Sequence, residues 1–109
     1  MRAPDACWVV KERLDRLPKS DLQSFAHMCP DFIIEIPSKT DRLKDLQLKM
    51  EEYMDNGCRL GFLIDPYDKK AWIYRPSQPP ELIADFTTSL PGEEVLPGFS
   101  LGLALFKVD

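Results

Sequence analysis

One acidic residue, Glu35, stands inside an otherwise apolar segment of the chain. This segment, DFIIEI at residues 31–36, is bounded by prolines, and its composition predicts a buried β-strand. Because side chains alternate along a strand, Glu35 shares one face with Ile33 and Asp31. A carboxylate among isoleucines loses hydration unless a metal ion, a cation or hydrogen bonds compensate it. Glu35 is therefore either a metal ligand or part of a solvated strand face.

A second ligand for a metal ion at Glu35 must come from another part of the chain. Asp31 lies four residues away on the same face, so its Cα is about 13 Å from that of Glu35, too far to share one ion. Asp5 immediately precedes the apolar run ACWVV at residues 6–10, which is also typical of a buried strand. If the two strands pair, Asp5 is well placed to join Glu35 at the metal.

Lys49 is the third candidate for a chemical role. It lies at the edge of the apolar face of a helix that the spacing predicts over 40–56. Two interpretations are open: the ammonium stays in water while the stem covers apolar surface, or it reaches Glu35 and orients a water molecule or stabilises a phosphoryl oxygen. Lys39 and Lys44, in the preceding loop and on the exposed side of the helix, are the competing lysines.

Other kinds of site find little support in the composition. His27 is the single histidine, which argues against a multi-histidine metal site and a histidine-based triad. The cysteines Cys7, Cys29 and Cys58 are widely spaced and form no CxxC, so we expect reduced, buried thiols. The 14 basic and 18 acidic residues give a net charge of −4, which disfavours nucleic-acid binding unless a local basic patch or a metal ion reverses the sign.

The elements that must position these residues form an alternating series. The helix over 40–56 begins with Ser38 and Asp41, which resemble a capping box, and Gly57 follows it as a C-terminal cap. The order of strands and helices predicts an α/β fold with a mixed sheet. The further expected elements are short helical segments at 11–17 and 19–28, strands at 59–65 and 71–75, and less regular structure at 81–86 and 101–106.

The apolar residues of the helix should cover the sheet. Leu43, Leu46, Met50 and Tyr53 recur at helical spacing. They are expected to pack on the strand face of Phe32, Ile34 and Ile36 or on the opposite face.

The length of 109 residues predicts one domain, residues 1–109, with one modest core. No apolar run approaches the length that a membrane helix needs, and the first residues show no secretory signal. We therefore expect a cytoplasmic protein without a membrane partner.

Taken together, these motifs resemble a known family. The stretch PDFIIEIPSKTDRLKDLQLKMEEYMDNGCRLGFLIDPYDKKAWIYRP, with LPG at 96–98, is similar to the Uma family of restriction-endonuclease-like proteins, in the PD-(D/E)xK nuclease superfamily. The resemblance runs from residue 2 to about residue 106. The matching positions are Pro4, Asp5, Pro30, Asp31, Glu35, Ser38, Asp41, Lys49, Tyr53, Gly57, Asp65 and Pro66.

This resemblance implies a restriction-endonuclease-like mixed sheet with a long helix packed on it, and a metal-dependent DNA endonuclease that hydrolyses phosphodiester bonds. Asp5 and Glu35 would hold Mg²⁺, with Mn²⁺ as a substitute, and the ion would activate water. The lysine expected two residues after Glu35 is replaced by Pro37. Lys49 on the helix would take its place.

The resemblance also implies that this chain lacks the N-terminal part of the usual core, because family members carry a helix and the opening strands before the first motif. The alternative function is therefore a non-catalytic remnant that acts through protein association. The strand at 6–10 would then have an open edge, which predicts a homo-oligomer with its contact near Cys7 and Trp8. Folding of 11–28 over that edge is the competing arrangement.

Overall fold

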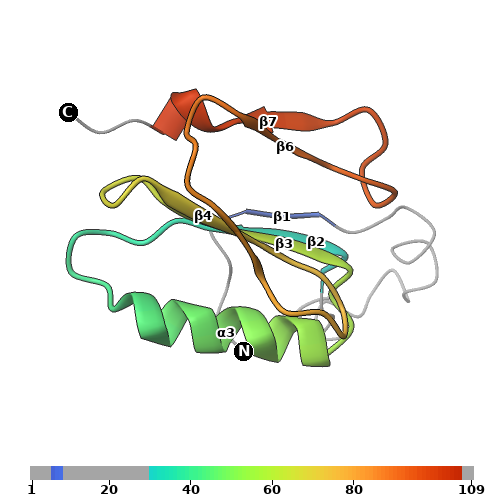
Figure 1. The fold of residues 1–109 in the computed structure, drawn as a ribbon. Helices are drawn as coiled ribbons and strands as arrows, with labels where there is room; N and C mark the ends of the chain where they lie inside the picture. The colour runs from blue at the N-terminus through green and yellow to red at the C-terminus, as the bar shows by residue number, and fades with distance from the viewer. Residues whose placement is uncertain (1–5, 9–29, 107–109) are drawn as a thin grey trace, which may run out of the picture.

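The computed structural model describes residues 6–8 and 30–106, which include one mixed five-stranded sheet (Figure 1). The strand order is β1-β2-β3-β4-β5, with β2 and β3 parallel and the other neighbouring pairs antiparallel. The predicted α/β fold with a mixed sheet is confirmed. The strands are β1 (Ala6–Trp8), β2 (Phe32–Glu35), β3 (Leu60–Asp65), β4 (Lys70–Tyr74) and β5 (Glu81–Ile83).

Two layers cover the two faces of this sheet. Helix α3 (Leu43–Asp55) lies on one face and forms the crossover that the parallel pair of β2 and β3 requires. The hairpin of β6 (Ser89–Pro91) and β7 (Ser100–Gly102), followed by the 3₁₀ turn η1 (Leu103–Phe106), lies on the other face (Figure 1). Among the described residues, no helix combines the length and apolarity needed to cross a bilayer. The helical segments predicted at 11–17 and 19–28 lie outside the described residues.

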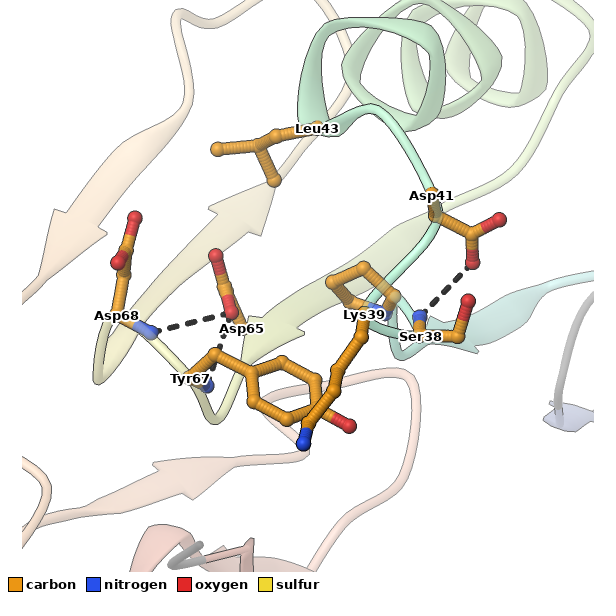
Figure 2. Close-up of a pocket in the computed structure, with 8 residues that line it drawn as sticks. Ser38, Lys39, Asp41, Leu43, Asp65, Tyr67 and Asp68 are labelled. Atoms are coloured by element: carbon orange, nitrogen blue, oxygen red, sulfur yellow. Dashed lines mark hydrogen bonds between the residues drawn. The ribbon is translucent and has the colours of Figure 1, made fainter.

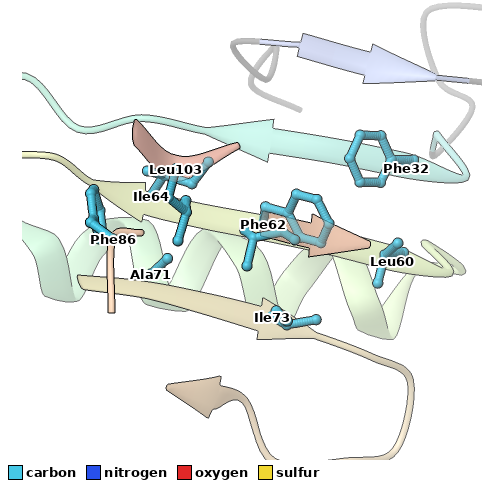
Figure 3. Packing of buried hydrophobic residues seen from close by; sticks show 9 residues of the cluster. Phe32, Leu60, Phe62, Ile64, Ala71, Ile73, Phe86 and Leu103 are labelled. Carbon is cyan, nitrogen blue, oxygen red and sulfur yellow. The ribbon is translucent and has the colours of Figure 1, made fainter. Parts of the chain in front are cut away.

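The buried cluster on the sheet face opposite α3 is apolar. Phe32 and Phe62 from β2 and β3 meet edge to face, with ring centroids 5.0 Å apart, and Phe99 approaches Phe32 at 6.1 Å. Leu103 closes this cluster from η1 (Figure 3). The short β6–β7 hairpin thus completes the core on this side, a role that the weak patterning of residues 89–102 did not reveal.

Helix α3 packs on the face of β2 that carries Ile33, the second of the two faces considered for it. Met50 is fully buried there together with Ile33 and Leu63. A Cβ added at Gly61 of β3 would lie 2.6 Å from the Met50 Cε, so a larger residue there would displace the end of the Met50 side chain. Leu46 is only half-buried, which makes Met50 the central apolar residue of the helix.

The sequence predicted the C-terminal cap of α3 correctly but not its N-terminal cap. At the C-terminal end Gly57 has φ of +104°, the Gly57 amide donates to the carbonyl of Met54, and the Cys58 amide donates to the carbonyl of Tyr53. This pair of bonds is a Schellman motif, so the predicted glycine cap is confirmed. Asn56 stands at the C-cap position.

At the N-terminal end, the expected capping box is wrong. The Asp41 carboxylate accepts a hydrogen bond from the Ser38 amide at 2.9 Å, so it closes a turn in the loop instead of capping the helix. Arg42 stands at the N-cap position without a side-chain hydrogen bond, and the helix begins at Leu43. An aspartate side chain can accept hydrogen bonds from backbone amides outside a helix as well as at a helix end. Here Asp41 accepts one in the loop before α3.

Replacement of Met50 tests the packing of α3. Met50→Ala is expected to lower the free energy of unfolding by about 2–5 kcal/mol, because it leaves a void between α3 and β3. Lys44→Ala, on the exposed side of the same helix, should change it by less than about 0.5 kcal/mol. Urea unfolding of both variants measures the difference, and equal costs would contradict this helix orientation.

Candidate functional site

Glu35 is the last residue of β2 and its side chain faces α3. Strand alternation places it on the same side as Ile33, and the register pairs it with Leu63 of β3, which packs under the same helix. Glu35 is 2% exposed, so the interpretation as a solvated strand face is wrong. A carboxylate in such a position needs compensation from neighbouring polar groups.

Lys49 supplies a positive charge to this carboxylate. Its Nζ lies 2.7 Å from Glu35 Oε1, and the two side chains are 13% and 3% exposed. Lys49 precedes Met50 on the helix, so the packing that buries Met50 also carries the ammonium toward the sheet. The Lys49 Nζ also lies 5.9 Å from the ring centroid of Tyr53, one helical turn further along. The interpretation with the ammonium in water does not hold.

The other predicted carboxylates are placed differently. Asp5 lies outside the described residues. The next residue in the sequence, Ala6, is described, and it is the partner of Ile34 in the antiparallel pairing of β1 with β2. Asp31 is 2% exposed at the opposite end of β2 from Glu35, and its carbonyl accepts hydrogen bonds from the amides of Arg59 and Leu60. Among the described residues, no three histidine, cysteine or acidic side chains are grouped as metal ligands.

Asp65 is a buried carboxylate that reasoning from the residues alone did not single out. It ends β3 two positions after Leu63, so it lies on the same sheet face as Glu35. Asp65 is 7% exposed, and its Oδ1 accepts hydrogen bonds from the amides of Tyr67 at 3.0 Å and Asp68 at 3.3 Å. It therefore shapes the turn to β4. The Asp-Pro pair in the family resemblance was the signal that could have found it.

A cavity of about 330 Å³ lies at this end of the sheet (Figure 2). The loop after β2, the start of α3 and the turn after β3 form its walls. Its position at the carboxyl ends of two parallel strands is where open α/β sheets commonly bind ligands. The residues that line it are Pro37, Ser38, Lys39, Asp41, Leu43, Asp65, Tyr67 and Asp68.

The Asp41 carboxylate, which lines this cavity, has a lowered pKa. The pKa of Asp41 is lowered chiefly by hydrogen bonds from the backbone and side chain of Ser38, and further by the positive charge of Lys49. The cavity adjoins the buried pair, because its lining includes Pro37, two residues after Glu35, and Asp65, on the same sheet face as Glu35. The buried pair and the cavity together form the candidate site.

The mixed sheet with α3 packed on it is a restriction-endonuclease-like α/β fold. The fold resembles a crystal structure described as a "putative nuclease belonging to DUF820" from Anabaena variabilis, with a TM-score of 0.65 and 24% sequence identity. The alignment covers 72% of this chain and 44% of that one, so the chain spans less than half the length of that nuclease structure. No curated protein matches the chain.

The family follows from the sequence model that matches residues 1–105 and carries the description "Putative restriction endonuclease". The chain belongs to this family, Uma2. The expected resemblance to the Uma proteins is confirmed.

The Glu35–Lys49 pair can be tested by its effect on stability. In EDTA, Lys49→Met is expected to lower the free energy of unfolding by about 3 kcal/mol, because it removes the cation beside a buried carboxylate. Glu35→Gln should cost less, because it leaves behind the less buried partner: the Lys49 side chain is 13% exposed and that of Glu35 3%. The double variant should cost less than the sum of the two, and additivity within about 0.5 kcal/mol in urea unfolding would contradict a coupled pair.

Proposed function

We propose that this chain is a metal-dependent nuclease domain that hydrolyses phosphodiester bonds in DNA. The observation that carries the proposal is the buried carboxylate of Glu35 with the ammonium of Lys49 at 2.7 Å, in a chain of the Uma2 family. Hydrolysis of a phosphodiester needs a group that neutralises charge on phosphate and one that positions water. A buried carboxylate and a lysine are suited to these tasks.

Glu35 and Asp5 are the residues that we propose as metal ligands. Carboxylate oxygens suit Mg²⁺, which commonly takes one or two of them and completes its shell with water and phosphate oxygens. Asp5 directly precedes β1 in the sequence, and β1 pairs with β2, the strand that ends at Glu35, which supports this choice. When bound, Mg²⁺ or Mn²⁺ would supply an activated water and neutralise phosphate charge.

Lys49 has the second role in this proposal. Its ammonium lies 2.7 Å from Glu35 Oε1 and 5.9 Å from the centroid of the Tyr53 ring, so contacts within the protein position it before any substrate arrives. At that position it can orient the attacking water or donate a hydrogen bond to a non-bridging phosphate oxygen. It would thus replace the lysine that Pro37 excludes from the strand.

Calorimetric titration with Mg²⁺ and Mn²⁺, together with cleavage of plasmid DNA, tests this function. We expect saturable metal binding and metal-dependent cleavage by the wild type, and the loss of both in Glu35→Gln. Glu51→Gln, which changes an exposed carboxylate on α3, is the matched control and should behave as the wild type. Failure of the wild type to cleave with either metal would refute the nuclease activity.

Association through β1 is a second candidate function. β1 lies at one edge of the described sheet, and strand edges invite pairing with another chain. We expect a dimer or larger oligomer at micromolar concentration in light scattering, weakened by Trp8→Lys. A monomeric wild type would contradict the association, whereas a dimer that Trp8→Lys leaves intact would reject only this interface.

A further inference from the structure

The rim of the cavity beside the candidate site carries an exposed aromatic ring with a lysine over it. Tyr67, in the turn after β3, is 44% exposed. The Lys39 Nζ lies 6.0 Å from the centroid of its ring. Figure 2 shows the Lys39 side chain passing the ring, with Asp65 at the end of β3 and Asp68 in the same turn as Tyr67. An aromatic face and an exposed cation side by side are the two groups that unpaired nucleotides contact most readily.

The size and position of the cavity fit one nucleotide. Its volume of about 330 Å³ is at the lower end of the roughly 300–1,000 Å³ typical of small-ligand sites. Pro37, which lines it, is two residues from Glu35, and Asp65, also in the lining, lies on the same sheet face as Glu35. A DNA strand that passes the Glu35–Lys49 pair would therefore reach this cavity within a short distance.

The charges of the cavity decide how a nucleotide would enter. Three carboxylates line it, Asp41, Asp65 and Asp68, and they repel a phosphate from the interior. Lys39 is the cation of the lining and is exposed at the rim. A phosphate is therefore favoured outside, beside Lys39, while the uncharged base lies inward against Tyr67.

We propose that this cavity is a nucleotide subsite, in which Tyr67 stacks on a base that has left its double helix and Lys39 pairs with the adjoining phosphate. The identity of the ligand as DNA rests on the proposed function. Both side chains are exposed, so Lys39 can leave the ring for the phosphate without disturbing the core. In this proposal Tyr67 and Lys39 bind the DNA strand, whereas Glu35 and Lys49 act in the hydrolysis of its phosphodiester bond.

Binding of a short fluorescein-labelled single-stranded oligonucleotide, followed by anisotropy in EDTA, tests the stacking role without cleavage. Tyr67→Ala is expected to weaken binding roughly fivefold to 150-fold, the range for loss of one base–aromatic stack. Tyr67→Phe keeps the ring and should bind within about twofold of the wild type. Leu82, on β5, is also apolar and exposed. Leu82→Ala is therefore the control for general loss of apolar surface.

The phosphate contact has its own measurement. In Lys39→Ala the slope of log affinity against log salt concentration should fall by about 0.7, the value for one phosphate contact on a single strand. Arg59→Ala removes an exposed cation just before β3, at the opposite end of that strand from the cavity, and should leave the slope unchanged.

The outcomes separate this inference from the proposed function. Equal binding by wild type and Tyr67→Ala, equal salt slopes in Lys39→Ala and Arg59→Ala, or no binding by the wild type overturns the subsite. In each of these cases, metal-dependent cleavage of plasmid DNA by the wild type would still support the proposed function. Conversely, binding that depends on Tyr67 in a protein that never cleaves DNA supports the subsite and refutes the nuclease activity.

Discussion

The burial of one carboxylate, Glu35, constrains the arrangement around it. A charge with 2% exposure is stable only beside groups that replace its hydration, and Lys49 of α3 provides such a group at 2.7 Å. The neighbouring residue Met50 packs over Gly61 of β3. One placement of the helix therefore satisfies both the apolar contact and the charge, so the candidate site and the core depend on the same packing.

The two faces of the sheet differ in the polarity of their buried side chains. The face of Phe32 and Phe62 is closed by the β6–β7 hairpin and η1 and carries apolar side chains. The face under α3 mixes apolar residues with the buried carboxylates of Glu35 and Asp65. Because strand residues alternate between faces, a short strand such as β2 can serve both at once.

The residues of the candidate site differ in how firmly the fold holds them. Glu35 lies on a strand and Lys49 on a helix, so packing on both sides limits their motion. Lys39 and Tyr67 lie on a loop and a turn at the same end of the sheet and are exposed. Rigid elements for reacting groups and surface loops for ligand contacts are a common division in enzymes.

The amino-acid pattern by itself determined the alternating strand at 31–36, the apolar stripe of the helix and its end at Gly57, because these depend on local periodicity and backbone conformation. It did not decide where the helix starts, since Asp41 had a choice of nearby backbone partners. It left open whether Lys49 meets Glu35 or stays in water, and it did not reveal the cavity lined by Asp65. Those features join residues far apart in the chain, and only the packing of α3 and the turns against the sheet brings them together.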